Sequence, residues 1–204
     1  MNENRKEQII MAALRLSAQK GLGAVSMNMI AEEIGIKKPS LYNHFASKEE
    51  LIEEMYNFLR QIAFEQSAPQ LVPLSKLSAC ADACEILQSM VGNYIKMNCQ
   101  KEIEMFYKVI YSERTISPAA AKIMVEETEK MIGATKQLFI ELQNRKLLHF
   151  EDLETDAASF AITIHGFMDY EADKCFSNGD NINRDDTLIK AYISNFCKAH
   201  TFKE

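Results

Sequence analysis

Apolar residues recur every three or four positions along most of the chain, which is the spacing that places side chains on one face of an α-helix. This spacing predicts the longer helices over residues 5–20, 48–66, 76–98, 102–113, 118–147, 152–177 and 185–199. The 118–147 helix contains Gly133, where a break, a kink or a close helix contact is an alternative to a continuous straight helix. No segment alternates apolar and polar residues over a useful strand length. The pattern therefore predicts an all-α protein.

Residues 26–51 predict two short helices around a tight turn, followed by the start of a third helix. Ser26 is expected to cap the first helix, and Gly35 to end it in the left-handed region of the backbone. The second helix is expected to begin near Lys38, because Pro39 is tolerated in a first helical turn. This arrangement is typical of a helix-turn-helix, whose second helix enters a DNA groove.

The second short helix has an apolar side and a polar side. Leu41 and Phe45 lie one turn apart and are expected to face inward, which leaves polar side chains outward. Ser47 and Glu50 have the spacing of a capping box, which would start the next helix at residue 48.

Taken together, these positions resemble the TetR family of bacterial transcriptional repressors. The matching positions are Ser26, Ile30-Ala31, Gly35-Ile36, Leu41-Tyr42, His44-Phe45 and Lys48-Glu49-Glu50-Leu51. The resemblance covers roughly the first fifty residues, and it is specific because many spaced positions match at once. It implies about nine helices, with a three-helix helix-turn-helix DNA-binding domain at residues 1–47 and a larger helical ligand-binding and dimerisation domain at residues 48–204.

The resemblance also implies which residues contact double-stranded operator DNA. The expected set is Ser26, Met27, Asn28, Lys37, Lys38, Pro39, Ser40, Tyr42, Asn43, His44 and Lys48. Within it, Tyr42 and Lys48 are expected at phosphates, and Asn43 among the residues nearest the bases. For His44 an alternative is a bridge between the small domain and the next helix. No operator sequence is predicted, because Met27 and Lys37 depart from the usual family pattern.

Methionine and aromatic residues gather where the family keeps its ligand cavity. The predicted pocket residues are Phe58, Met90, Tyr94, Met97, Phe106, Tyr107, Tyr111, Met124, Met131, Phe139 and His165. Flexible methionines and the polar tips of tyrosines suit a mostly apolar small-molecule effector. The alternative for each single residue is ordinary core packing, and for His165 it is a satisfied core or interface histidine.

The family pairs its last two helices with those of a second copy in a four-helix bundle, which implies a homodimer. The expected interface residues are Phe160, Ile164, Phe167, Met168, Leu188, Ile189, Tyr192 and Phe196. Their apolar arcs are wide enough to face both the same subunit and a partner. The alternative is that both helices only complete the core of a monomer.

Charge is unevenly distributed along the 204 residues, whose net charge is −6. Residues 1–50 hold seven Lys and Arg against six Asp and Glu, whereas residues 51–204 hold 16 against 23. DNA binding should therefore rest on the first segment, because the acidic remainder is repelled by phosphates. Two copies in a dimer would double the phosphate contacts of one weakly basic head.

The five cysteines are an odd number and show no Cys-x-x-Cys spacing, which argues against a disulfide scaffold. Without a signal peptide or a membrane-spanning apolar run, free thiols in the cytoplasm are expected. Cys80 and Cys84 share a helix face, so a redox or metal sensor is an alternative, although no histidine lies nearby in sequence to complete a metal site. No cofactor or metal site is predicted.

Common catalytic motifs such as a glycine-rich phosphate loop or a His-Glu-x-x-His pair do not occur, so an enzyme is not expected. The favoured hypothesis is a repressor released from its operator by a small hydrophobic or amphipathic ligand. One alternative is a DNA-binding regulator controlled by a protein partner or by thiol modification. A more remote alternative is an all-helical enzyme or binding protein.

Overall fold

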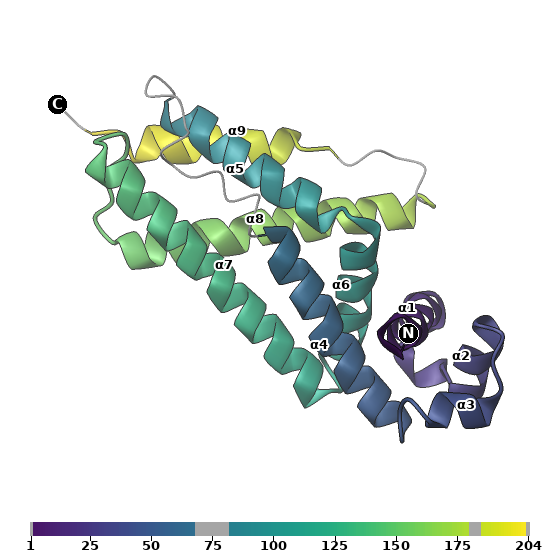
Figure 1. The fold of residues 1–204 in the computed structure, drawn as a ribbon. Helices are drawn as coiled ribbons and strands as arrows, with labels where there is room; N and C mark the ends of the chain where they lie inside the picture. Colours follow the sequence, from purple (N-terminus) through teal and green to yellow (C-terminus); the bar gives the residue numbers. More distant parts are fainter. Residues whose placement is uncertain (1, 68–81, 180–184, 203–204) are drawn as a thin grey trace. The chain divides into compact units, whose positions relative to one another are not determined.

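The helical spacing of the apolar residues is realised in the computed structural model, which describes residues 2–67, 82–179 and 185–202 (Figure 1). Within these ranges the chain forms α-helices and one short 3-10 helix, and no strand. The elements are α1 (Asn2–Lys20), η1 (Leu22–Ala24), α2 (Met27–Glu33), α3 (Lys38–Tyr42), α4 (Lys48–Ser67), α5 (Ala83–Asn98), α6 (Lys101–Glu113), α7 (Pro118–Asn144), α8 (Leu153–Ser177) and α9 (Thr187–Ala199). The all-α prediction is therefore confirmed.

The structure decides two details of the predicted helices: Gly133 does not break its helix, and the 76–98 helix begins later than predicted. No break occurs at Gly133, because α7 is continuous from Pro118 to Asn144; a glycine inside a helix costs only about 1 kcal/mol relative to alanine, which the flanking turns can offset. The predicted 76–98 helix begins at Ala83, since Asp82 is its cap and accepts a 2.8 Å hydrogen bond from the backbone N–H of Glu85. Residues 76–81 lie outside the described residues.

The first of two compact units comprises Met1–Pro69 and Met97–Met124. Its apolar core joins α1, α2, α3, α4 and α6, and Ile9, Phe45, Met55 and Phe106 are among its fully buried side chains. Helix α1 packs against both α4 and α6, so the three-helix head shares its core with two further helices. A boundary at residues 47 and 48 stays a prediction.

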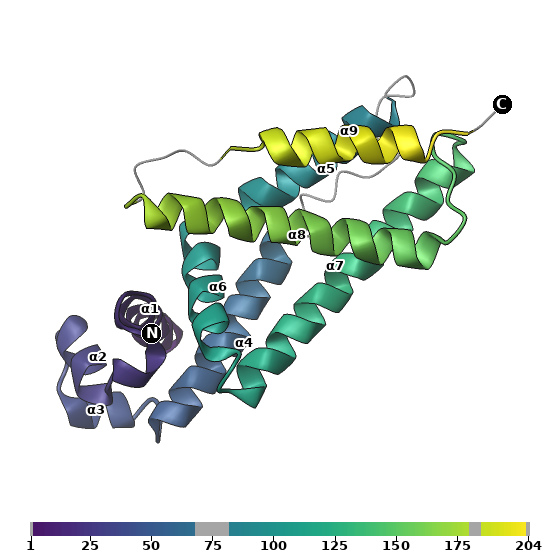
Figure 2. The ribbon, with the colours of Figure 1, turned by 180° about the vertical axis from the view of Figure 1, so that it is seen from behind.

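The second unit comprises Gln70–Lys96 and Val125–Glu204. Its core is rich in aromatic rings: Phe139 stacks on Phe150 with ring centroids 4.5 Å apart and also contacts Phe160 and Phe196. Helix α9 runs along α8, as both ribbon views show (Figure 2).

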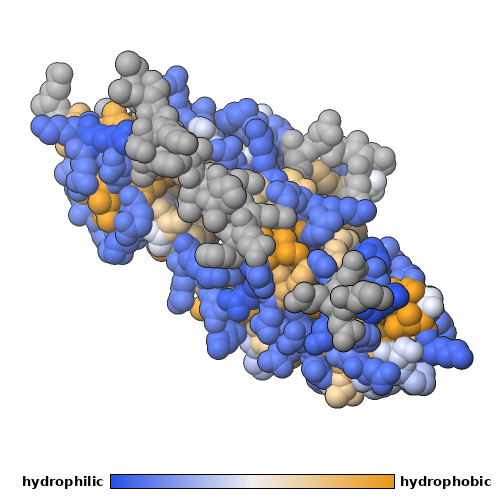
Figure 3. Space-filling model, in the orientation of Figure 1, coloured by the Kyte–Doolittle hydropathy of each residue, from blue (hydrophilic) through white to orange (hydrophobic). Residues whose placement is uncertain are grey.

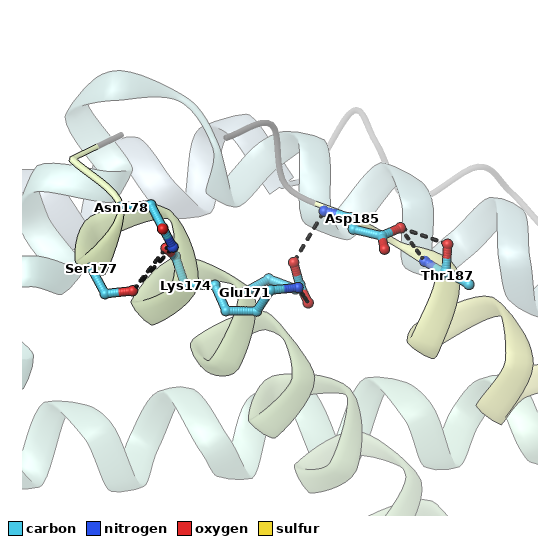
Figure 4. Close-up of polar contacts among 6 residues, drawn as sticks. All are labelled: Glu171, Lys174, Ser177, Asn178, Asp185 and Thr187. Atoms are coloured by element: carbon cyan, nitrogen blue, oxygen red, sulfur yellow. Dashed lines mark hydrogen bonds and ion pairs between the residues drawn. The ribbon is translucent and has the colours of Figure 1, made fainter. Parts of the chain in front are cut away.

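Hydrogen bonds among Glu171, Lys174, Asp185 and Thr187 connect the last turns of α8 to the start of α9 (Figure 4). Glu171 is buried in α8, where one carboxylate oxygen accepts from Lys174 Nζ at 2.9 Å and the other from the backbone N–H of Asp185 at 3.1 Å. Asp185 in turn accepts hydrogen bonds from the backbone N–H and the hydroxyl of Thr187 at 2.9 and 2.6 Å. Hydrogen bonding from Lys174 lowers the pKa of Glu171, so the carboxylate stays ionised at neutral pH.

Hydrophilic side chains cover most of the face seen in Figure 3, and apolar side chains appear on it as separate patches. Among the described helices, none has the length and hydropathy to cross a membrane.

Candidate DNA interface

The turn between α2 and α3 is built by local hydrogen bonds that the sequence specifies. Ser26 caps α2, because its hydroxyl oxygen accepts from the backbone N–H of Met29 at 3.3 Å. Gly35 follows α2 with φ of 67°, and its N–H donates to the carbonyl of Glu32 at 3.1 Å. The N–H of Ile36 donates to the carbonyl of Ala31 at 2.9 Å, which completes a Schellman motif. The chain therefore reverses sharply before α3.

Helix α3 is short and is held by two buried side chains at its carboxyl end. Lys37 precedes it in an extended conformation, and Pro39 occupies its first turn as expected. Leu41 is fully buried, and Phe45, just past the helix, is almost completely buried. Of the positions between these anchors, Tyr42 and Asn43 are exposed, whereas His44 is half-buried.

Helix α4 starts with the predicted capping box. The Ser47 hydroxyl accepts from the backbone N–H of Glu50 at 3.1 Å, and the Glu50 carboxylate accepts from the N–H of Ala46 at 2.5 Å. The reciprocal bond thus reaches one residue further back than the predicted cap. Lys48 spans to η1, where its Nζ donates to the carbonyl of Leu22 at 2.8 Å. Besides any phosphate contact, Lys48 therefore ties α4 to the rest of the head.

The predicted DNA-contact residues fall into three groups by exposure. Exposed are Ser26, Asn28, Lys37, Lys38, Pro39, Ser40, Tyr42 and Asn43, whereas His44 and Lys48 are half-buried. Met27 is only 6% exposed and packs in the core of the first unit, so its side chain is not available to DNA in this structure. Its prediction as a DNA contact is wrong for the side chain, because periodicity could not show that the first residue of α2 turns inward.

Several exposed side chains of this surface are already positioned by neighbours. The ammonium of Lys38 lies 5.9 Å from the centre of the Tyr42 ring, and Tyr42 is 44% exposed. Asn28 donates from Nδ2 to the carboxylate of Glu32 at 2.7 Å. Such contacts restrict the side-chain rotamers before any partner binds, so less conformational entropy is lost on binding.

Sequence reasoning missed Lys6. Its ammonium lies 5.5 Å from the centre of the Phe45 ring, although α1 is far from α3 in sequence. This places an exposed cation of α1 beside the residue that anchors the end of α3. The only sequence signal was a basic residue in the first turns of α1, which pattern alone could not connect with the DNA-reading segment.

The predicted pocket residues are divided between the two units. Phe58, Met97, Phe106, Tyr107, Tyr111 and Met124 belong to the first unit, whereas Met90, Tyr94, Met131, Phe139 and His165 belong to the second. Phe106 and Phe139 are fully or almost fully buried members of the two apolar cores, so for them the core-packing alternative describes the structure. The other members are partly buried.

One polar pair stands out among these residues. Tyr94 on α5 and His165 on α8 are hydrogen-bonded, with 2.5 Å between the Tyr94 hydroxyl oxygen and His165 Nε2. Burial lowers the pKa of His165, and the carboxylate of Asp169 opposes that shift. A neutral histidine paired with a tyrosine can present a hydrogen-bonding group to a buried ligand.

The predicted dimer-interface residues differ in whether their side chains point into the core of their own unit or toward solvent. Phe160, Ile164, Ile189 and Phe196 are buried within the core of their own unit, so their side chains are not free for a partner. Phe167, Met168 and Tyr192 are partly buried, and Leu188 is exposed. Apolar side chains that do face solvent on α8 are Ile162, Tyr170 and Phe176, none of which was predicted. Helical spacing identified the helices but assigned part of the outward face wrongly.

The amino-acid sequence is similar to those of bacterial regulators, most clearly in its first segment. Residues 9–55 match the family model described as bacterial regulatory proteins, tetR family. The chain is 50% identical over 52 residues to the HTH-type transcriptional regulator YerO of Bacillus subtilis, a match that covers 26% of this chain and 18% of the relative. It is 28% identical over 112 residues to the HTH-type transcriptional regulator BetI of Vibrio campbellii, with 55% of each protein covered.

Solved structures share the fold over almost the whole chain. A protein from Mesorhizobium loti described as a TetR-family transcriptional regulator aligns with a TM-score of 0.68 and 21% identity, covering 98% of this chain and 96% of that one. A transcriptional regulator from Saccharomonospora viridis, in complex with choline, aligns with a TM-score of 0.69 and 16% identity, covering 99% and 100%. These similarities extend the shared fold beyond residues 9–55, which match the family model.

Proposed function

We propose that this chain, which belongs to the TetR family of bacterial regulatory proteins, is a homodimeric, sequence-specific DNA-binding repressor that a small molecule releases from its operator. The observation that carries the proposal is the solvent-exposed polar face of α3, held between a Schellman turn and two buried anchors. The family and the relatives described above are regulators and not enzymes. This agrees with the expectation from the sequence that the protein is not an enzyme.

For DNA binding, we assign different tasks to the exposed side chains. Lys38 and Asn43 would face bases in the major groove, where amine and amide groups can bond to guanine and adenine edges. Tyr42 and Lys6 would contact phosphates, which fix the position of the protein but carry no sequence information. Lys48 would hold α4 and η1 together so that these side chains keep their register.

For dimerisation, we propose the solvent-facing side of α8 and the start of α9. Ile162, Tyr170, Phe176 and Leu188 are exposed apolar side chains on these two helices. The side chains buried beneath them keep each pair of helices in one subunit, while the exposed ones can be covered by a second copy. A dimer would present two recognition helices to two half-sites of the operator.

For the effector, we propose a site in the second unit that includes the hydrogen-bonded pair Tyr94 and His165. The pair supplies hydrogen-bonding groups from two different helices, which suits an amphipathic ligand with one hydrogen-bonding end. The structurally similar protein from Saccharomonospora viridis is in complex with choline, which supports small-molecule binding by this fold. Release from DNA would require the ligand to bind more tightly to the protein conformation that does not fit the operator than to the conformation that does.

The test is fluorescence-polarisation binding to the DNA that flanks the protein's own gene, at roughly 50 and 200 mM salt. Tyr42→Ala should weaken binding at least about tenfold, because a hydrogen bond to a charged group contributes roughly 1.5–3 kcal/mol and each head would lose one. Lys38→Ala should weaken binding to this DNA and reduce its preference over an unrelated sequence, because the ammonium is assigned to a base edge.

The matched control is Lys130→Ala. Lys130 is an exposed lysine of the second unit, paired with Glu127 at 2.9 Å. The Lys130→Ala substitution removes one positive charge, as Lys38→Ala does, but from the unit that does not contain α3, and it should leave binding unchanged. Equal binding by wild type and all three variants would contradict the assignment of α3 as the reading helix.

A further inference from the structure

Two exposed side chains of α2 are joined by a hydrogen bond. Asn28 and Glu32 lie one helical turn apart, and Asn28 Nδ2 donates to Glu32 Oε1 at 2.7 Å. Asn28 is one of the residues that the family resemblance implies at DNA, whereas the resemblance assigns no role to Glu32. A carboxylate beside such a residue needs an explanation, because it is repelled by the phosphates of DNA.

The hydrogen bond fixes the direction of the Asn28 amide. An ionised carboxylate only accepts hydrogen bonds, so the amide turns its nitrogen toward Glu32 and its oxygen, Oδ1, away. The backbone at both ends of the pair is also held. The Ser26 hydroxyl caps the start of α2, and the Glu32 carbonyl accepts from the N–H of Gly35 at 3.1 Å. The amide therefore has one orientation before any partner binds.

The pair is rich in hydrogen-bond acceptors. Asn28 Oδ1 and Glu32 Oε2 have no hydrogen-bond partner among the residues that the structure describes. Phosphate oxygens are themselves acceptors and carry negative charge, so this pair is a poor phosphate ligand. It complements a base edge that offers a donor.

The donors of the major groove are the exocyclic amines of two bases. Adenine offers its N6 amine beside the N7 acceptor, and cytosine offers its N4 amine, whereas guanine and thymine present acceptors at the corresponding position. Helix α2 packs against α3 (Figure 1), whose first turn has the opposite chemistry. Lys37 and Lys38 there carry donors only, which suit guanine.

We propose that Asn28 and Glu32 form a second base-reading site, on α2, which binds the exocyclic amine of an adenine or a cytosine in each half-site. The proposal rests on the proposed DNA-binding function. Asn28 is the contacting residue, because its Oδ1 accepts from the amine. Glu32 is a positioning residue, which prevents the amide from turning its nitrogen toward the base. Without Glu32 both orientations are open, and the site also accepts guanine or thymine.

The test is selection of bound sequences from a random duplex library by the full-length protein. Each base pair of the selected site is then exchanged in competition binding. Wild type should prefer adenine or cytosine at one position, and Asn28→Ala should abolish that preference. An exchange between adenine and cytosine on the same strand keeps the amine, so it should cost less than an exchange to guanine or thymine.

Glu32→Gln tests the positioning role. Glutamine can hydrogen-bond to either orientation of the amide, so the preference at the same base pair should fall at least about fivefold. In an Asn28→Ala background, Glu32→Gln should change the preference no further. The salt dependence of binding should be equal in wild type and Asn28→Ala, because no phosphate contact is lost.

Glu33→Gln is the matched control. Glu33 is the next residue of α2, is exposed, and pairs with Arg15 at 3.9 Å. Its substitution removes the same charge as Glu32→Gln but leaves the hydrogen bond to Asn28 in place. Both glutamine variants should bind unrelated DNA at least as tightly as wild type, and only Glu32→Gln should lose the base preference. Circular dichroism checks that each variant is folded.

Three results would overturn the proposal. They are an Asn28→Ala variant that keeps every base preference of wild type, a Glu32→Gln variant that keeps the preference lost in Asn28→Ala, and a base pair at which guanine or thymine costs no more than the exchange that keeps the amine. Selection of no sequence by wild type would instead contradict the proposed function, and this proposal with it. The two failures are therefore distinguishable.

Discussion

Replacing Phe139 by alanine distinguishes a core residue from a ligand-pocket residue. The sequence placed Phe139 in an effector pocket, whereas the structure shows its side chain fully buried. The ring stacks on Phe150 at 4.5 Å between centroids, and the rings of Phe160 and Phe196 are each 5.4 Å away. A ring enclosed in this way contributes to folding whether or not a ligand is present.

The magnitude follows from these contacts. Truncation of a buried phenylalanine to alanine costs about 3–5 kcal/mol, which includes the cavity left behind. An aromatic pair adds roughly 0.5–1.5 kcal/mol beyond the area it buries, so three neighbouring rings favour the upper part of that range. For a chain of this size the melting temperature should fall by roughly 2–4 °C per kcal/mol.

The assay is urea unfolding followed by circular dichroism, at one fixed protein concentration because the stability of a dimer depends on concentration. The matched control is Phe202→Ala; Phe202 is 43% exposed, and its ring contacts that of His149. This variant should lose less than about 1 kcal/mol. A loss below about 2 kcal/mol for Phe139→Ala would refute the reasoning, because it would mean that the ring borders space that is already empty.

Two further predictions concern the turn of the DNA-reading segment and the polar pair of the second unit. In thermal melts, Gly35→Ala should destabilise the protein by about 1–2 kcal/mol, because φ of 67° is strained for a residue with a Cβ. The control is Gly23→Ala, at a glycine without positive φ and with open space around it, which should be nearly neutral in the same measurement. His165 has a pKa lowered mainly by burial, so the unfolded chain binds its proton first as the pH falls. The stability it contributes is complete above pH of about 6.5 and is lost as the pH falls toward the folded pKa. Urea midpoints at pH 7.5 and 5.5 should therefore differ less in His165→Asn than in wild type, and an equal difference would rule out this histidine as the cause.

The parts of the molecule that the sequence determined are those set by neighbours within four residues. The caps at Ser26 and Ser47, the left-handed Gly35 and the inward Leu41 and Phe45 all depend on local hydrogen bonds or on the helical repeat. Because the partners are fixed by spacing along the chain, a pattern of residue types was enough to predict them.

Direction and long-range partners were decided by the tertiary structure. Periodicity shows that a helix has an apolar side, but a wide apolar arc does not reveal which part of it the same chain covers. For this reason Met27 was assigned to the DNA surface although it is buried, and Ile162 and Phe176 were missed on the exposed side of α8.

Some side-chain contacts join residues that are far apart in sequence. Lys48 donates to the carbonyl of Leu22, and Tyr94 pairs with His165. The sequence by itself determined the helices, their caps and the outward polar face of α3, since these depend on local geometry. Only the tertiary structure decided which side chains from different helices lie together, because that choice depends on how the helices pack and not on the order of residues within any one of them.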